Sequence, residues 1–373
     1  MGAADYETPK KSTRVREQTR APIEAWVAKQ IPDATDVVVP EIDSPSGTGM
    51  SSETLLFELQ LSQGGERKTW PLVARLAPDQ ADCPIFPTYD LEGQFRLLSL
   101  IAEHGSLPVP RMRWLEPGTG TIGAPFFVMD RVDGRVPPDI PPYVFAGWVF
   151  DASPEERATL QDETVGAIAA LHAIDREAAG TAFLEFPLPG DTPMRRHFEN
   201  QRRFYDWVKA DGHSHPVLES AFAWLEDRWP KDEGEAVISW GDSRIGNVLY
   251  DGFRPAALLD WEMAAIGPRE LDLGWLAFMH RFFQDIAVGA GLPGLPDFLR
   301  LEDVATSYER ASGHTPRDLD FYFTYAALRH GIIMARIHRR MVHFGQSEWS
   351  DDPDGMIPHR DALKGMIDGS FWS

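Results

Sequence analysis

Three polar side chains in one short stretch of the sequence have the types and spacing to carry chemistry. Asp242 and Asn247 lie in SWGDSRIGNVLYD, and Asp260 ends the apolar segment AALLD. Strand-like sequence flanks both segments, so their loops can lie side by side. Carboxylate and amide oxygens suit Mg²⁺, and a carboxylate within reach of a substrate hydroxyl can accept its proton. Phosphoryl transfer needs one base and two metal-holding groups of this kind.

The same residues are also ordinary components of turns. Asp and Asn next to Gly are common in turns, and an isolated D-x-x-x-x-N pattern has low specificity. On spacing alone, a structural turn explains the segment as well as a phosphoryl-transfer site does. The order of the surrounding features favours the second interpretation. A Gly/Ser loop, a basic residue on the third strand, a helix, an Asp loop and a strand ending in Asp follow one another as in kinases.

The sequence before residue 132 predicts a β-rich unit. A helix is expected over 21–31, beginning near Pro22. Two strands over 54–62 and 69–77, joined through Gly64 and Gly65, indicate a hairpin. The remaining expected elements are a strand at 37–39, an amphipathic helix over 91–105, and strands over 108–116 and 124–132.

A Pro-rich break at 136–142 separates this unit from a sequence dominated by helices. Helices are expected over 153–174, 194–210 and 215–229, and again from 260 to the C-terminus, around a β-rich island at 236–260. We therefore predict an N-terminal β-rich lobe, residues 1–132, and a larger helical C-terminal lobe, residues 133–373.

A long part of the chain resembles the aminoglycoside phosphotransferase family. The family pattern is H-G-D-x-x-x-x-N, an apolar strand ending in I-D-W-E, and a Gly followed closely by D-L. The segments TGMSSET and PTYDLEGQF are similar to actinobacterial phosphotransferase-like proteins and to the kinase-like domain attached to some acyl-CoA dehydrogenases. The resemblance implies an α+β, protein-kinase-like two-lobe fold. The matching positions are Gly241, Asp242, Asn247, Asp260, Trp261, Glu262, Gly267, Asp272 and Leu273.

The resemblance also implies roles and cofactors. Asp242 would be the catalytic base, and Asn247 and Asp260 would hold Mg²⁺ that bridges the phosphates of ATP. Asp272 would brace the catalytic loop. The hinge from Asp130 to Val132 would pair with the adenine ring through main-chain groups. The phosphates would be covered by the loop that contains Ser46, Gly47, Thr48, Gly49, Ser51 and Ser52.

Three positions depart from the family pattern. Trp240 stands where the family has His, Arg75 where it has the phosphate-contacting Lys, and Gln94 where it has the Glu that pairs with that Lys. Arg keeps the charge but presents a planar fork rather than a compact ammonium. Either these substituted residues hold ATP in a modified way, or the chain binds nucleotide weakly. A nucleotide-binding pseudoenzyme with weak or no phosphotransfer is therefore the alternative to an active phosphotransferase with an alcohol acceptor.

Several other residues are given structural interpretations. Ser243, in Gly-Asp-Ser, invites a serine-hydrolase hypothesis, but the chain has no D-x-x-H motif to supply the His base. His172, at the end of an apolar helix, is expected to be a core histidine. The aromatic residues Trp275, Phe278 and Phe282 are expected in the core. A basic stripe is interpreted as ion pairs to the acidic body, with a grip for an anionic substrate as the alternative; it comprises Arg329, Arg336 and Arg340.

Composition restricts the class of protein. The chain has 373 residues, a formal charge of −21 and 43% apolar residues, so we expect a folded chain and no nucleic-acid partner. A single cysteine excludes an intrachain disulfide, and the absence of a long apolar run predicts no membrane partner and a cytoplasmic location. Residues 1–132 carry a net charge of −5 and residues 133–373 carry −16. This acidity suits a cationic aminoglycoside and the basic stripe suits a hydroxyacyl compound, so both classes of small-molecule acceptor stay open.

Overall fold

The computed structural model describes residues 14, 17–44, 51–211 and 213–372. The chain divides into two compact units. Unit 1 consists of Met1–Ser99 and Val109–Asp133, and unit 2 of Leu100–Pro108 and Gly134–Ser373. One division falls inside α2 (Leu91–His104), whose last turn therefore groups with unit 2.

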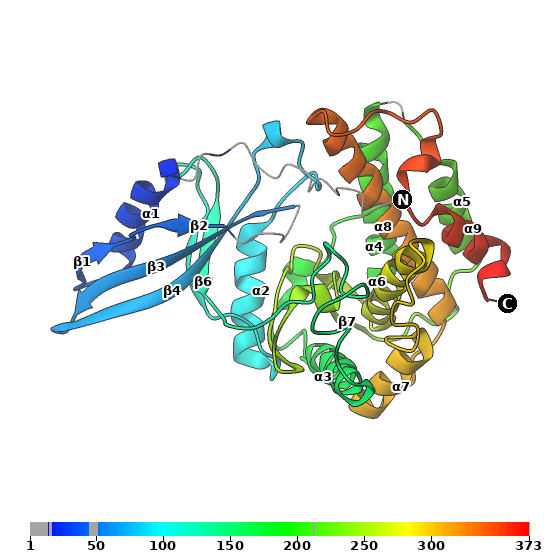
Figure 1. The fold of residues 1–373 in the computed structure, drawn as a ribbon, viewed down its shortest axis with the longest axis horizontal. Coiled ribbons are helices and arrows are strands. Elements are labelled where there is room, and N and C mark those ends of the chain that lie inside the picture. The colour runs from blue at the N-terminus through cyan, green and yellow to red at the C-terminus, as the bar shows by residue number, and fades with distance from the viewer. Residues whose placement is uncertain (1–13, 15–16, 45–50, 212, 373) are drawn as a thin grey trace. The chain divides into compact units, whose positions relative to one another are not determined.

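Unit 1 contains an antiparallel sheet (Figure 1). Its strand order is β1-β3-β4-β6-β5, with β2 paired to β3. The hairpin expected from the sequence is confirmed, and Gly64 and Gly65 form its turn with φ angles of +62° and +82°, which other residues adopt rarely. The strands are β1 (Thr35–Val38), β2 (Ile42–Asp43), β3 (Glu53–Gln63), β4 (Glu66–Leu76), β5 (Met112–Glu116) and β6 (Phe126–Asp130).

A helix covers each face of this sheet. Alternate residues of β6 point to opposite faces, so Phe126 packs with α1 (Glu17–Gln30) and Phe127 with α2. On the α1 face, the ring centroids of Trp26 and Phe126 lie 4.7 Å apart. The expected start of the first helix near Pro22 is wrong, because α1 begins at Glu17 and encloses the proline. Ion pairs from Arg20 to Glu17 and Glu24 stabilise this earlier start.

Unit 2 is built mainly of helices. In Figure 1, α8 runs beside α6 and α4. Two short antiparallel pairs, β7 with β10 and β8 with β9, lie among them. The helices are α3 (Pro154–His172), α4 (Pro193–Val208), α5 (Pro216–Asp227), α6 (Glu270–Gly289), α7 (Leu301–Ser312), α8 (Leu319–His343) and α9 (Arg360–Asp368), and the strands are β7 (Ala236–Ser239), β8 (Val248–Asp251), β9 (Arg254–Leu258) and β10 (Ala265–Pro268).

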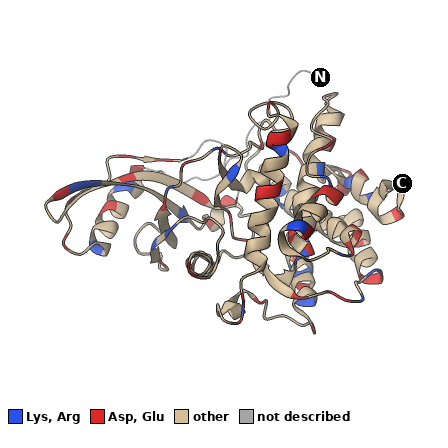
Figure 2. Cartoon of the chain, turned by 90° about the horizontal axis from the view of Figure 1, so that it is seen from below, with Lys and Arg blue, Asp and Glu red and all other residues tan. Residues whose placement is uncertain are grey.

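Charged residues are interspersed along these elements. Figure 2 shows acidic residues in red and basic residues in blue recurring along several helices. Within the described ranges, no helix is both long enough and apolar enough to cross a membrane.

The two strand pairs bring two loops of unit 2 together. Ser239 at the end of β7 faces Ala265 of β10, and Val248 at the start of β8 faces Leu258 at the end of β9. The Leu259 N–H then donates to the carbonyl oxygen of Asn247 at 2.8 Å. The Asp242 loop (residues 240–247) and the Asp260 loop (residues 259–264) therefore adjoin, as the sequence predicts.

Asp272, in the first turn of α6, ties the Asp242 loop to the helices. Its side chain is fully buried. Oδ1 accepts from the Gly241 N–H at 2.9 Å and the Ser239 hydroxyl at 3.0 Å, and Oδ2 accepts from the Trp240 N–H at 2.8 Å. The bracing role expected for Asp272 is confirmed by these contacts.

His172 completes the set of donors around Asp272. Its Nε2 lies 2.9 Å from Oδ2 of Asp272, and its Nδ1 lies 2.7 Å from the Tyr308 hydroxyl. His172 is therefore a buried, locally hydrogen-bonded histidine, as expected. Burial would raise the pKa of Asp272, but the hydrogen bonds from His172 and from the Gly241 and Trp240 amides outweigh it and hold the pKa below its ordinary value.

Substitution Asp272→Asn should destabilise the chain by about 3 kcal/mol or more at pH 7, because an amide nitrogen would face donors in a buried site. The folded-state pKa of Asp272 is lowered, so its charge stabilises the fold above pH of about 4 and this contribution is lost as the pH falls through that pKa. Urea unfolding at pH 7 and below pH 4 should therefore show a gap between variant and parent that narrows in acid.

The exposed Asp297, whose side chain is 92% accessible, provides the matched control. Asp297→Asn should leave the free energy of unfolding within about 0.5 kcal/mol of the parent at both pH values. If Asp272→Asn lowered the free energy of unfolding by as much below pH 4 as at pH 7, the Asp272 charge would not be stabilising.

Candidate functional site

Donors from three residues hold the Asp242 carboxylate. Trp275 Nε1 donates to Oδ1 at 2.7 Å, and Asn247 Nδ2 donates to Oδ2 at 2.7 Å. Arg244 Nε lies 3.2 Å from Oδ1 and 3.3 Å from Oδ2. The Asp242 side chain is 17% exposed, so it is fixed but not sealed from solvent. A carboxylate oxygen accepts more than one hydrogen bond, so Asp242 can still receive a proton from a bound hydroxyl.

Arg244 lies between two carboxylates. Its Nη1 donates to Asp139 Oδ2 at 2.6 Å while its Nε faces Asp242. Burial would lower the pKa of the Arg244 guanidinium, but the Asp139 and Asp242 carboxylates outweigh it and raise the pKa. The positive charge beside Asp242 is therefore permanent. Sequence analysis missed both Arg244 and Asp139, although the position of Arg244 two residues after Asp242 was a signal.

Asn247 and Asp260 lie on the two adjoining loops. The amide nitrogen of Asn247 is used by Asp242, at 2.7 Å from Oδ2 and 3.0 Å from the main-chain oxygen. The Oδ1 atom of Asn247 accepts no hydrogen bond from the residues that the structure describes. An amide oxygen of this kind is a hard ligand that suits Mg²⁺. Asp260 has a φ angle of +60°, in the left-handed region that aspartate tolerates better than most residues.

Gly241 lets the Asp260 loop approach the Asp242 loop. Its φ angle is +89°, and a Cβ atom there would lie 2.1 Å from the carbonyl oxygen of Met263. Only glycine fits this position. The close approach of the two loops therefore depends on the residue immediately before Asp242.

Trp240, which departs from the family pattern, has a defined role in the structure. Its side chain is fully buried, and its Nε1 donates to the carbonyl oxygen of Leu259 at 2.9 Å. Its ring packs against Trp261, with centroids 5.6 Å apart. Trp240 therefore links the Asp242 loop to the residue that precedes Asp260.

Four of the candidate nucleotide-binding residues lie outside the residues that the structure describes: Ser46, Gly47, Thr48 and Gly49. The described candidates belong to unit 1. Ser51 and Ser52 lead into β3. Arg75, on β4, donates from Nη1 to the Thr54 hydroxyl on β3 at 3.0 Å. Gln94 is buried on α2.

The segment from Asp130 to Val132 follows the end of β6. Asp130 accepts from Arg113 Nε at 2.5 Å and Nη2 at 3.0 Å, and its own N–H donates to the carbonyl oxygen of Arg111. The N–H of Arg131 donates to Pro71. The Val132 N–H has no partner among the described residues, so it is the amide of this segment that remains available to a ligand.

The structure also tests the secondary hypotheses. Ser243 is fully buried and donates its hydroxyl to the carbonyl oxygen of Asp272, which agrees with the rejection of a serine nucleophile. Phe278 and Phe282 are buried as expected. Trp275 is buried too, but its contact with Asp242 makes it part of the site, which helical spacing alone could not indicate.

The basic stripe of α8 is buried rather than exposed. Arg329 is 1% exposed, Arg336 5% and Arg340 1%. Arg329 Nη2 donates to the carbonyl oxygen of Gly241 at 3.0 Å, and no ion pair involves Arg329 in the part of the chain that the structure describes. For Arg329, the ion-pair interpretation is therefore wrong, and its side chain is too buried to serve as a grip for an anionic substrate. Its burial under the Asp242 loop was not visible in the sequence.

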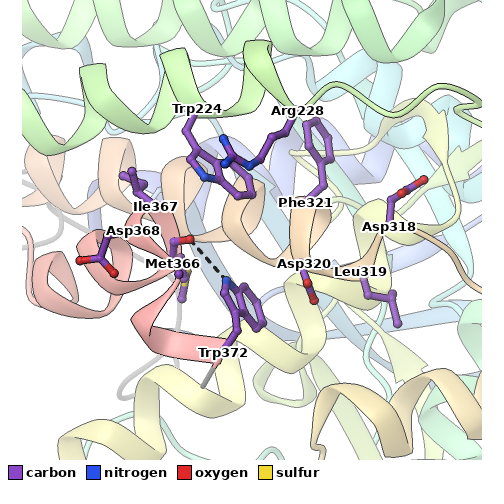
Figure 3. A pocket seen from close by; sticks show the side chains of 11 residues that line it. Trp224, Arg228, Asp318, Leu319, Asp320, Phe321, Met366, Ile367, Asp368 and Trp372 are labelled. Atoms are coloured by element: carbon purple, nitrogen blue, oxygen red, sulfur yellow. Dashed lines mark hydrogen bonds between the residues drawn. The ribbon is translucent and has the colours of Figure 1, made fainter.

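A separate pocket of about 540 Å³ lies between α5, the start of α8 and the C-terminal residues (Figure 3). Trp224, Asp320 and Trp372 are among the residues that line it. None of Asp242, Asn247 and Asp260 lines this pocket. It is therefore distinct from the site on the two loops.

Solved structures share this fold. A Ralstonia eutropha protein assigned as an aminoglycoside phosphotransferase superposes with a TM-score of 0.65 and 23% identity, covering 93% of this chain and 96% of that one. A thermostable mutant of aminoglycoside phosphotransferase APH(4)-Ia, in a ternary complex with AMP-PNP and hygromycin B, has a TM-score of 0.51 and 15% identity, with coverages of 94% and 99%. The α+β, protein-kinase-like fold expected from the sequence is confirmed.

Curated relatives include larger proteins. The Arabidopsis thaliana protein named "Probable acyl-CoA dehydrogenase IBR3" is 24% identical over 317 residues, which are 80% of this chain and 36% of that protein. Human acyl-CoA dehydrogenase family member 11 is 26% identical over 245 residues, which are 63% of this chain and 29% of that protein. The chain thus spans about a third of the length of these relatives.

The profile of the phosphotransferase enzyme family matches residues 59–304, more than half of the chain. The matched region contains Asp242, Asn247, Asp260 and Asp272, the residues around which the two loops are built. The chain therefore belongs to the phosphotransferase enzyme family.

Proposed function

We propose that this chain is an ATP- and Mg²⁺-dependent phosphotransferase that moves the γ-phosphoryl group to a hydroxyl of a small molecule. The observation that carries the proposal is the juxtaposition of Asp242 with Asn247 and Asp260 on two adjoining loops. Family membership supports the same class of reaction.

Asp242 is the proposed base. Its two oxygens are held by Trp275 and Asn247, so the carboxylate is oriented before a substrate binds. It accepts the proton of the acceptor hydroxyl as the oxygen attacks phosphorus, and the bond to the leaving phosphate oxygen breaks. Pre-orientation of this kind lowers the barrier because little reorganisation is needed during the reaction.

Asn247 and Asp260 are the proposed Mg²⁺ ligands. Because the amide nitrogen of Asn247 is engaged by Asp242, its oxygen is the atom left for a metal. The described residues contain no group of three His, Cys, Asp or Glu side chains that could hold a metal by themselves. Two protein ligands can suffice for Mg²⁺, which completes its shell with phosphate and water. When bound, the ion neutralises charge on the phosphates.

The proposed nucleotide contacts lie in unit 1. The Val132 N–H is the amide that could pair with adenine, and the segment Ser46–Ser52 would cover the phosphates with main-chain N–H groups. The ternary complex of APH(4)-Ia contains an ATP analogue, which supports ATP as the donor.

A specific observation favours the alternative of a nucleotide-binding pseudoenzyme. Arg75, at the position of the family Lys, donates to Thr54 on the neighbouring strand, and Gln94 carries no charge to pair with it. In the active enzyme, Arg75 would have to contact phosphate from this position. Turnover by the unmodified chain separates the two functions.

Substitution Asp242→Ala should lower turnover by about 10²–10⁴-fold and leave Mg²⁺–ATP binding largely intact, because the base acts only on the acceptor hydroxyl. The measurement is a coupled ADP-release assay beside calorimetry with a non-hydrolysable ATP analogue. Asp251→Ala, at the exposed end of β8, is the matched control and should change neither quantity. Full turnover in Asp242→Ala would show that another group is the base.

Substitution Asp260→Ala should abolish the part of ATP-analogue affinity that depends on Mg²⁺, since it removes a proposed charged ligand of the ion. Calorimetric titrations with Mg²⁺ and with EDTA give this difference directly. Asp251→Ala should keep it. An unchanged Mg²⁺ dependence in Asp260→Ala would remove Asp260 from the metal site.

For the acceptor, we propose a hydroxyacyl compound, because the curated relatives are named as acyl-CoA dehydrogenases. In a thermal-shift screen with Mg²⁺ and an ATP analogue, hydroxyacyl-CoA esters should raise Tm more than the corresponding acyl-CoA esters or cationic aminoglycosides. A larger shift with aminoglycosides would instead assign the acceptor to the cationic class named in the titles of the solved structures.

A further inference from the structure

We propose that Trp275 is a positioning residue for Asp242, and that Arg329 strengthens the hydrogen bond by which it acts. This inference rests on the proposed role of Asp242 as the base. Through these residues, α6 acts directly on the reacting carboxylate and α8 acts on it through Trp275, beyond the core packing that their sequences indicate.

The contact between Trp275 and Asp242 is short and shielded. Trp275 is 2% exposed, and its Nε1 lies 2.7 Å from Asp242 Oδ1. The indole has a single N–H and no acceptor, so it can only donate. With Asn247 donating to Oδ2 at 2.7 Å, each carboxylate oxygen has its own donor. The two donors come from different elements and together fix the rotation of the carboxylate about its bond to Cβ.

Arg329 lies against the face of the same indole. Its guanidinium carbon is 4.5 Å from the centroid of the Trp275 ring, and its Nη2 donates to the carbonyl oxygen of Gly241 at 3.0 Å. A cation over the face of an indole withdraws electron density from the ring and polarises its N–H. Trp275 therefore donates to Asp242 more strongly than an isolated indole would.

The burial of Arg329 makes this arrangement specific. A guanidinium that is 1% exposed carries a large desolvation cost. Its direct contacts are the Gly241 carbonyl and the aromatic faces of Trp275 and Tyr325. The nearby Asp272 and Asp242 carboxylates also favour its charge, although neither forms an ion pair with it among the described residues. Despite this desolvation cost, the Arg329 cation lies next to the loop that carries Asp242. It also contacts the Trp275 ring, which holds the Asp242 carboxylate.

The first test measures the hydrogen bond without any activity. In ¹⁵N-tryptophan-labelled protein, the Trp275 indole N–H signal is assigned by its loss in Trp275→Phe. We expect Asp242→Ala to move this signal upfield, because the carboxylate acceptor is gone. Trp229 is the matched control, since its Nε1 donates to Glu233 at 2.6 Å and its signal should stay in place. An unmoved Trp275 signal would overturn the contact.

The second test measures the effect on the reaction. Trp275→Phe keeps an aromatic ring but removes the N–H, so kcat should fall about 10–100-fold while KM for ATP stays within about twofold. Trp229→Phe should change neither constant. If the parent is active and Trp275→Phe retains its kcat within twofold, Trp275 is not a positioning residue. An inactive parent would count against the proposed function, and the indole signal would then decide the inference alone.

Arg329 provides an independent variant should Trp275→Phe fold poorly. Arg329→Met should move the Trp275 indole signal upfield and lower kcat with KM for ATP unchanged, whereas Arg329→Lys should recover part of both. In the double variant with Trp275→Phe, the Arg329→Met effect on kcat should shrink, because the N–H through which it acts is absent. Fully additive effects would overturn the coupling between the two residues.

Discussion

The structure of unit 2 depends on one buried carboxylate. Asp272 accepts hydrogen bonds from the main chain of the Asp242 loop, from the end of β7 and from α3 through His172. A fully buried charge is tolerable only when its oxygens are satisfied, and here four donors satisfy them. The start of α6 is thereby locked to the loop that precedes β8. This lock fixes Trp275, one helical turn further along α6, opposite Asp242.

Much of this arrangement could be predicted from the sequence. Helical and alternating patterns identified the elements, Gly64 and Gly65 identified the hairpin, and the spacing of Asp242, Asn247 and Asp260 identified two adjoining loops. These features are local, since each is determined by residues close together in the chain. Family resemblance added Asp272, whose partners lie about 30 and 100 residues away.

The remainder depended on contacts between distant segments. Trp275 has the spacing of a core residue, and only the position of its nitrogen shows that it holds Asp242. Arg329 belongs to a basic stripe that resembles an exposed helix face in the sequence. In the structure it lies beneath Gly241, with its charge against the ring of Trp275. Residue type and periodicity do not distinguish an exposed arginine from a buried one that lies against aromatic faces. The expected start of α1 was wrong for a local reason. The helix begins at Glu17 and encloses Pro22, and Arg20 forms ion pairs with Glu17 before the proline and with Glu24 after it.

In this chain, Trp240 joins the two loops from the motif position where the family has His. The indole N–H of Trp240 reaches the Leu259 carbonyl and so joins the two loops. Histidine can also present a ring N–H, so a histidine at this position could make the same kind of contact. A motif written in donors and acceptors would admit His and Trp and would exclude Phe and Leu. Sequence searches that demand His at this position would overlook chains whose loops are joined in the same way.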